Sequence, residues 1–196
     1  MLKPILLSLG LMFLLGNFPG FAQEKNDAWE NRILVKTNIF NLLAQRSTFS
    51  VEKVFKQGYG AEISFVQGKF NYFLFTDHYY YRGFLLRTKK YFGKGKLGVI
   101  YPYLGVYAGN LKRTIQTNGQ SDHTGWFGFP SRDFSAQSVR GGGTLGIACF
   151  FKSKIVVDGQ TSLGYGRYLS HKQTNPNTYA KGYLDMQVWL SLGYGF

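Results

Sequence analysis

The chain has 196 residues, which suits a single domain, and it carries 23 Lys and Arg against 10 Asp and Glu, a formal net charge of +13. Its single cysteine, Cys149, excludes an intramolecular disulfide framework. After residue 22 no apolar run approaches the roughly 20 residues of a membrane-spanning helix, which excludes a helical membrane protein.

Residues 1–22 have the features of a cleavable signal peptide. Lys3 precedes an apolar stretch over residues 5–15, and Gly20 and Ala22 are small residues at the positions that a signal peptidase reads. A membrane-anchoring helix is the alternative, although the apolar stretch is short for that role. Because no cysteine follows the expected cleavage site, a lipoprotein is not predicted. Residues 23–31 would form a short polar lead-in.

Eight segments alternate apolar and polar residues with a period of two, which is typical of β-strands whose faces meet different surroundings. In chain order they cover 32–40, 47–55, 60–67, 82–92, 97–113, 133–151, 155–170 and 183–196. The last is the clearest, because the row that begins at Leu184 and ends at Phe196 is apolar throughout. Its other row is polar or small apart from Tyr183 and Trp189.

The connections between these segments alternate in expected length. The first, third, fifth and seventh cover 41–46, 68–81, 114–132 and 171–181, whereas the others are turns near Gln57, Gly95 and Ser153. Within the third, Tyr72 to Phe75 could alternatively extend a neighbouring strand. An even strand count with longer loops on one rim is the plan of an outer-membrane β-barrel. We therefore predict an all-β fold over 32–196, an eight-stranded antiparallel up-and-down transmembrane β-barrel. Both termini and the lead-in at 23–31 would lie on the periplasmic, short-turn side.

The apolar rows are expected to face acyl chains and the polar rows the interior. An open sheet edge is prohibitive in hydrocarbon, and a closed barrel has none. The composition agrees, since 18 Phe and 14 Tyr would supply the aromatic girdles of a membrane barrel. A soluble lipocalin-like carrier is the alternative, and it would reverse the two faces.

Three short stretches carry a resemblance to a known family: KTNIF at 36–40, FSVEK at 49–53 and YGAE at 59–62. They resemble a family of small eight-stranded outer-membrane barrels with no assigned function, similar to the outer-membrane protein A and X-like barrels. The ending Tyr194-Gly195-Phe196 is similar to the C-terminal aromatic signal that barrel-assembly machinery recognises. The resemblance therefore implies Tyr194 and Phe196 as an assembly signal and that machinery as a partner.

The polar rows that face inward bury charged side chains. Because an unpaired buried charge destabilises the folded chain, we expect ion pairs among these side chains. The first hairpin can bring Lys36 near Glu52, while Glu62 would lie near Glu52 and needs a cation such as Arg87. A structural plug is the favoured interpretation, and a gated path or catalytic carboxylate pair is the alternative. The expected network comprises Lys36, Glu52, Glu62, Arg87, Asp158 and Asp185.

Cationic residues gather near the longer loops, where an outer leaflet rich in phosphorylated glycolipid would meet them. We expect lipopolysaccharide contacts from Lys69, Arg82, Lys112, Arg113, Arg132, Lys172 and Lys181. General solubility is the alternative, because the short turns are basic as well.

Other candidate sites are weaker. His78, His123 and His171 fall in expected loops with no metal-binding spacing, so no metal site and no cofactor are predicted. Ser170 and His171 are adjacent on a strand and would point to opposite faces, which is poor geometry for a nucleophile and its base. Cys149 is expected to face lipid.

Three classes of function remain: a structural or surface-interaction barrel, a narrow channel or transporter, and a lipid-A-modifying enzyme. The aromatic stretch at 68–81 and the tip at 126–129 are the best contact surfaces for the first class. We predict the first class, with no enzymatic activity. The chain would be a monomer in the outer membrane of a Gram-negative-type cell, without a nucleic-acid partner.

Overall fold

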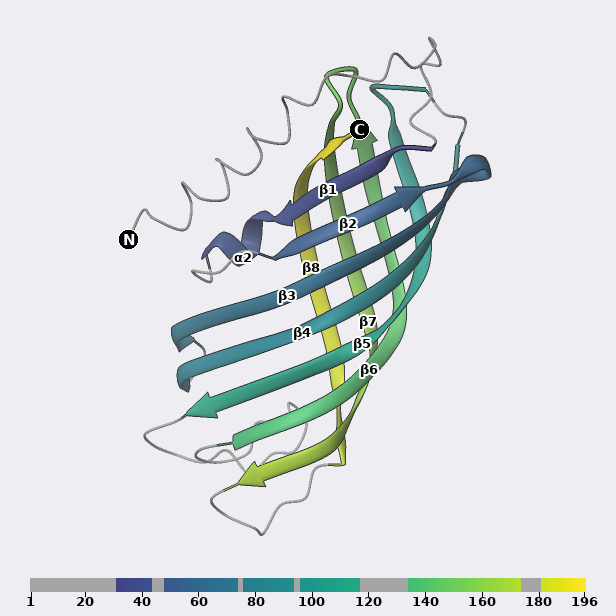
Figure 1. Ribbon diagram of the computed structural model, residues 1–196. Helices are drawn as coiled ribbons and strands as arrows, with labels where there is room; N and C mark the ends of the chain where they lie inside the picture. Colours follow the sequence, from purple (N-terminus) through teal and green to yellow (C-terminus); the bar gives the residue numbers. More distant parts are fainter. Residues whose placement is uncertain (1–30, 44–47, 74–75, 94–95, 117–133, 174–180) are drawn as a thin grey trace.

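The chain forms one closed antiparallel β-barrel. The computed structural model describes residues 31–43, 48–73, 76–93, 96–116, 134–173 and 181–196. Each strand pairs with the next in sequence, and the last closes onto the first (Figure 1). The strands are β1 Ile33–Asn38, β2 Phe49–Val54, β3 Tyr59–Phe73, β4 Thr76–Tyr91, β5 Ile100–Gln116, β6 Phe134–Phe150, β7 Ile155–Gln173 and β8 Gly182–Gly195. The predicted eight-stranded up-and-down barrel is confirmed, while the signal peptide at 1–22 and most of the lead-in lie outside the described residues.

Two short helical elements connect the first three strands. The helix α2, Ile39–Leu43, follows β1, and the 3-10 turn η1, Lys56–Gly58, joins β2 to β3. Gln57 and Gly58 take left-handed φ angles of 65° and 74°, which turn the chain back on itself within three residues. None of the helices in the described part of the chain is long and apolar enough to cross a membrane.

The stretch predicted as an aromatic loop at 68–81 is instead paired strand. β3 and β4 stay in register through Gly68 and Tyr81 and beyond, and only residues 74–75 separate the two strands. Phe70 stacks on both Tyr79 and Tyr81, with ring centroids 6.3 Å apart in each case. Cross-strand aromatic pairs of this kind stabilise a β-ladder, so the aromatic run prolongs the hairpin.

The first strand is shorter than predicted. It ends at Asn38, whose side-chain oxygen accepts a hydrogen bond of 3.0 Å from the backbone N–H of Phe40. This is an N-cap, and it starts α2 where the alternation of apolar and polar residues suggested more strand. β1 and β2 therefore contain six residues each, whereas the other six strands contain 14 to 19.

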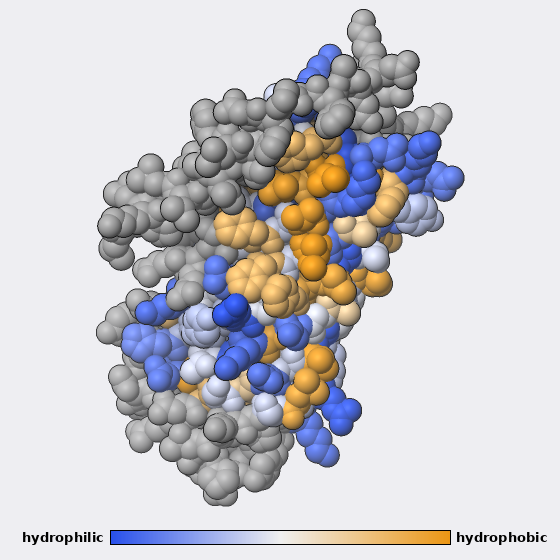
Figure 2. Space-filling model, in the orientation of Figure 1, coloured by the Kyte–Doolittle hydropathy of each residue, from blue (hydrophilic) through white to orange (hydrophobic). Residues whose placement is uncertain are grey.

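Burial alternates along the strands in the predicted sense. On β8 the outward residues Leu184, Met186 and Val188 are 61–69% exposed, whereas Asp185 and Gln187 between them are buried. Apolar side chains gather in a band on the outer wall (Figure 2). The described strands thus form a barrel with an apolar exterior and a polar interior. The alternative prediction of a soluble carrier, with apolar residues inside and polar residues outside, is wrong for these strands.

The strands are strongly tilted. Cross-strand partners followed from Ser64 through β4, β5, β6 and β7 lead to Tyr183 on β8. The opposite direction, through β2 and β1, leads from Ser64 to Gly193, ten residues further along β8. This offset is the shear that closes a barrel, and an eight-stranded barrel has an interior narrow enough for side chains to fill.

The interior is layered along the barrel axis. We call the rim that holds η1 and the C-terminus the turn rim, and we call the opposite rim the loop rim. The layer nearest the turn rim is apolar and aromatic and comprises Leu34, Val54, Tyr91, Tyr101, Tyr103, Ala148, Phe150 and Val156. A charged layer follows. Towards the loop rim come a layer of Val66, Leu85, Tyr107, Leu111 and Trp189 and then one of Ile115, Phe134 and Ala136.

Inward tyrosines lie across glycines of the adjacent strand. Tyr183 covers its cross-strand partner Gly166, where an added Cβ would come within 2.2 Å of the ring. Tyr81 covers Gly68 in the same way. A glycine at such a position lets the ring fill the narrow interior, an arrangement known as aromatic rescue of glycine.

We therefore expect Gly166→Val to destabilise the folded barrel by about 1–3 kcal/mol, because the new side chain displaces the Tyr183 ring. Gly143→Val is the matched control, since an added Cβ at Gly143 meets nothing within 4 Å. Chemical denaturation of both variants checks the prediction. Equal stability of the two variants would contradict it.

Candidate functional site

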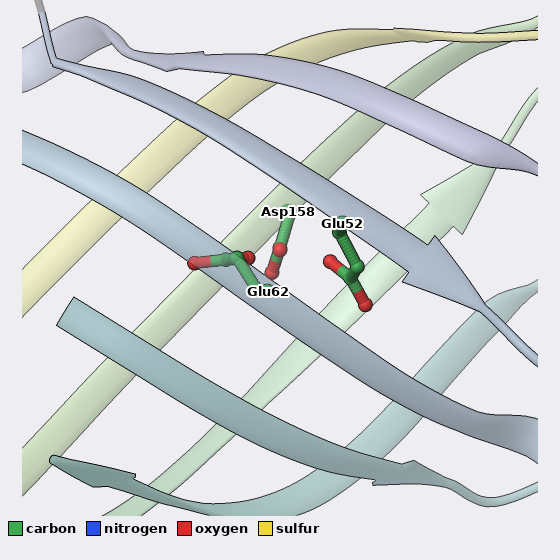
Figure 3. A group of neighbouring side chains, drawn as sticks. All are labelled: Glu52, Glu62 and Asp158. Atoms are coloured by element: carbon green, nitrogen blue, oxygen red, sulfur yellow. The ribbon is translucent and has the colours of Figure 1, made fainter.

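The charged layer of the interior is a cluster of six side chains from five strands. Lys36 comes from β1, Glu52 from β2, Glu62 from β3, Arg87 and Lys89 from β4, and Asp158 from β7, and all six are buried. The three carboxylates converge on one space inside the barrel (Figure 3). We call this set the ion cluster.

Two ammonium groups hold the carboxylates together. Lys36 Nζ lies 2.6 Å from Glu52, 2.5 Å from Glu62 and 2.7 Å from Asp158. Lys89 Nζ lies 3.0, 2.9 and 2.8 Å from the same three residues. Arg87 adds an ion pair with Glu62. Three cations thus balance three carboxylates, which meets the requirement that buried charges be paired.

Hydroxyl groups satisfy further carboxylate oxygens. Tyr91 Oη donates to Glu52 over 2.5 Å, and Tyr103 Oη donates to Asp158 over 2.6 Å. The ring of Tyr103 also lies 4.8 Å from Lys89 Nζ, a cation–π distance. The aromatic residues next to the cluster therefore share in its hydrogen bonding and exclude water from it.

The three carboxylates are the residues that could hold a metal ion. One oxygen from each of Glu52, Glu62 and Asp158 lies within 4.8 Å of the others, and oxygen donors suit hard cations such as Ca²⁺ or Mg²⁺. Lys36 and Lys89 already provide the compensating positive charge at this point. The arrangement favours an internal salt-bridge cluster over metal coordination.

The structure brings together five of the six residues predicted for one network. Asp185 lies in a second group, where it accepts hydrogen bonds from Tyr107 (2.8 Å), Gln187 (2.7 Å) and Arg140 (3.2 Å). Arg87 Nη2 donates a hydrogen bond of 3.5 Å to Gln187 Oε1, which links the two groups.

Two cations of the interior were missed in the predicted network. Lys89 lies two residues after Arg87 on the same face of β4, so the period of two could have identified it. Arg140 on β6 pairs with Asp185 on β8 over the intervening strand β7, and only the strand register could have placed it there.

Arg113, predicted to contact glycolipid at the rim, points into the barrel and is 8% exposed. Its guanidinium carbon lies 3.7 Å from the centroid of the Tyr183 ring. The prediction was wrong because Arg113 shares the inward face of β5 with Tyr107 and Leu111. Its Nε and Nη2 atoms have no hydrogen-bond partner within the described part of the chain.

The other predicted rim residues are exposed where the structure describes their side chains, and their contact with glycolipid stays a prediction. Lys69, Arg82, Lys112 and Lys181 are exposed, and Arg82 and Lys112 are cross-strand partners on β4 and β5. Arg132, His123, the 126–129 tip and the side chains of Lys172 and His171 lie outside the described residues. His78 is exposed, and Cys149 is a half-buried free thiol on the outward row of β6.

Comparisons with known proteins do not show which family this chain belongs to. No protein-family model matches the sequence, and no curated protein matches it. One similar solved structure is the N-terminal beta-barrel domain of Pseudomonas aeruginosa OprF, at 17% sequence identity and a TM-score of 0.49. The match covers 85% of this chain and 98% of that chain. The fold therefore rests on the strand register of the chain itself, and membership of a particular family of small barrels stays a prediction.

Proposed function

We propose that the protein is an integral outer-membrane barrel that serves a structural or surface-interaction role, without enzymatic activity. The observation that carries the proposal is the apolar outward row on the strands of a closed barrel. Soluble monomers rarely expose contiguous apolar patches larger than about 600 Å². In hydrocarbon the same rows are favourable, and closure leaves most of the backbone paired.

Strand length and direction support this placement. Six of the strands, at 14 to 19 residues, exceed the roughly 9–11 residues needed to cross a bilayer. Single-chain barrels of this kind belong to bacterial outer membranes, with short turns on the periplasmic side. We accordingly assign the turn rim, which holds the C-terminus, to the periplasm of a Gram-negative-type cell.

The side chains inside the barrel favour a plugged barrel rather than a channel. The ion cluster and the aromatic layer between it and the turn rim place buried side chains throughout the half of the interior next to that rim. Their charges are balanced and hydrogen-bonded, so little remains to attract a solute. Planar-bilayer recordings of the purified monomer are therefore expected to show no sustained conductance.

Lipopolysaccharide is the proposed partner of the loop rim. Arg82 and Lys112 are exposed cross-strand partners, and like charges directly opposite each other are destabilising. A phosphate group between them would relieve that repulsion and accept hydrogen bonds from both. Lys69 and Lys181 extend the same cationic rim.

The C-terminus supports recognition by barrel-assembly machinery. The rings of Tyr194 and Phe196 contact each other at a centroid distance of 5.1 Å, and Phe196 is exposed. The Phe196 backbone N–H donates to the carbonyl of Ile33 over 2.9 Å, so this end of β8 forms the closing seam. The exposed ring of Phe196 and the half-buried ring of Tyr194 give that seam an aromatic surface that an assembly factor can bind before closure.

Refolding tests the proposal. The chain without residues 1–22 is denatured in urea and diluted into lipid vesicles. We expect it to float with the vesicles, and to migrate faster on a gel when the sample is left unheated than when it is heated. Diluted into buffer without lipid or detergent, it is expected to aggregate. A monodisperse, folded protein in plain buffer would overturn the membrane assignment.

A further inference from the structure

The turn rim carries cations in all three of its connections. Lys56 belongs to η1, Lys96 lies between β4 and β5, and Lys152 and Lys154 lie between β6 and β7. These four side chains are exposed, and Arg32, directly before β1, adds a half-buried cation. The rim therefore presents positive charge around the barrel and not at a single point.

No acidic side chain opposes these cations within the part of the chain that the structure describes. Its acidic residues are Glu52, Glu62, Asp158 and Asp185, which are buried in the interior, and Asp77, which lies near the loop-rim end of β4. Soluble surfaces intersperse charges of both signs, and a field of one sign attracts a partner of the other. General solubility therefore does not account for the composition of this rim.

Exposed phenylalanines lie directly inside the cations. One follows the last residue of each strand that runs to the turn rim, and all are 41–48% exposed: Phe55 after β2, Phe92 after β4, Phe151 after β6 and Phe196 after β8. We call these four residues the phenylalanine girdle. Aromatic girdles of membrane barrels mark the level at which acyl chains meet polar head groups. Lys56 and Lys152 each follow a girdle residue in the chain, so they lie at the level of the phosphates.

Two lysines on the outward faces of strands reach toward the same level. Lys53 Nζ donates to the carbonyl of Asn31 over 2.7 Å, and Lys90 Nζ donates to the carbonyl of Gln57 in η1 over 2.6 Å. Long cationic side chains leave an apolar wall for the interface in this way, which is called snorkelling. Because an ammonium group has three donors, each lysine keeps donors beyond these bonds.

The cations are densest around η1. Lys53 from β2, Lys56 from η1 and Lys90 from β4 gather on either side of β3, and we call them the η1 lysines. Figure 2 shows hydrophilic side chains gathered at this end of the wall, beside the apolar band. Three cations that border a membrane wall are suited to a group that carries a phosphate at its polar end and acyl chains below it.

We propose that the turn rim binds anionic phospholipid, with the η1 lysines as the main site. The phosphate of a phosphatidylglycerol-type head group accepts hydrogen bonds from the ammonium groups, while the acyl chains lie along Phe55 and the apolar wall. A lipid fits better than a soluble acidic protein, because the cations border the phenylalanine girdle. The proposal rests on the membrane assignment and adds a second lipid surface, opposite the loop rim.

Quenching by brominated lipid tests the site. Phe55→Trp places a tryptophan beside Lys56, and Trp29, Trp126 and Trp189 are replaced by Phe so that no other tryptophan remains. Emission is measured in vesicles that mix phosphatidylglycerol with phosphatidylcholine, with bromine on the acyl chains of one lipid at a time. We expect phosphatidylglycerol to be preferred about fivefold or more at this tryptophan, the factor that one cation near an anionic surface supplies. Equal association of the two lipids would overturn the proposal.

Single cations on opposite halves of the wall supply a matched pair of variants. Lys56→Gln is expected to lower the preference severalfold, whereas Lys56→Arg keeps the charge and is expected to keep the preference. Arg167→Gln removes one exposed cation from β7 on the side of the loop rim and is expected to leave the preference unchanged. An equal loss in Arg167→Gln and Lys56→Gln would reduce the effect to net charge and sink the proposal.

The chain's own lead-in is the competing partner for the turn-rim cations, because Glu24, Asp27 and Glu30 precede β1. Glu24→Gln, Asp27→Asn and Glu30→Gln together are expected to leave the lipid preference in place. A preference that appears only in this combined variant would assign the cations to the lead-in and refute the lipid site.

The lipid site and the membrane assignment can fail separately. Flotation with vesicles and the gel shift report whether the barrel inserts at all. A barrel that inserts without preferring the anionic lipid refutes the turn-rim site alone, whereas a chain that does not insert refutes the proposed function.

Discussion

Lys89→Met is expected to destabilise the folded barrel by about 3–5 kcal/mol, the usual cost of removing one partner from a buried ion pair. The substitution leaves three carboxylates with Lys36 and Arg87, and an excess negative charge stays buried. Methionine nearly matches the volume of lysine, so the loss comes from charge and not from a cavity. Urea unfolding in lipid vesicles measures the difference.

The adjacent residue is the control. Lys90 lies on the outward face of β4, where its Nζ is 3.8 Å from the centroid of the Tyr59 ring. Lys90→Met is expected to change the free energy of unfolding by about 1 kcal/mol or less, the usual range for an exposed cation–π contact. Adding Glu52→Gln to Lys89→Met restores the balance of charge and is expected to recover part of the loss. A Lys89→Met barrel as stable as Lys90→Met would show that the cluster does not hold the interior together.

Leu145→Arg should have the second large effect. Leu145 is exposed on the outward face of β6, midway along the apolar row that runs from Val139 to Phe151. An arginine at the midplane of a bilayer destabilises a barrel by about 2–4 kcal/mol, and near the interface by about 0–1 kcal/mol. The same substitution on the surface of a soluble protein would be close to neutral.

Gln137→Arg supplies the depth control, since Gln137 is exposed near the loop-rim end of the same strand. We expect it to be nearly neutral. Unfolding of both variants from vesicles checks the difference. A Leu145→Arg barrel that unfolds at the same urea concentration as Gln137→Arg would argue that no hydrocarbon touches this wall.

The faces of the strands could be predicted because each face meets a different medium. Along β8 the alternation of Asp185 and Gln187 with Leu184 and Met186 is complete, so the inside and outside could be read directly. The signal is lost in β3 and β4 beyond Gly68, where aromatic residues occupy both faces. That is why a paired hairpin was predicted as a loop.

Partners across the barrel could be predicted only where hairpins join them. Lys36 and Glu52 belong to one hairpin, and Glu62 and Arg87 to another, so their contacts followed from the faces alone. Asp158 reaches the same cluster because the strands are offset along the barrel axis when the barrel closes. No local sequence pattern encodes that offset. Arg113 was misplaced because its nearness to a loop was weighed above its position in the alternation.

The unequal lengths of the strands bear on how the ring is closed. β3 to β8 form a long curved sheet that supplies Glu62 and Asp158 with Arg87 and Lys89 to the ion cluster, two charges of each sign. The β1–β2 hairpin, the smallest unit of the wall, carries Lys36 and Glu52, one of each sign. Both halves of the cluster are electrically neutral before they meet. If the hairpin docks last, it therefore completes the salt bridges without moving net charge through the apolar wall.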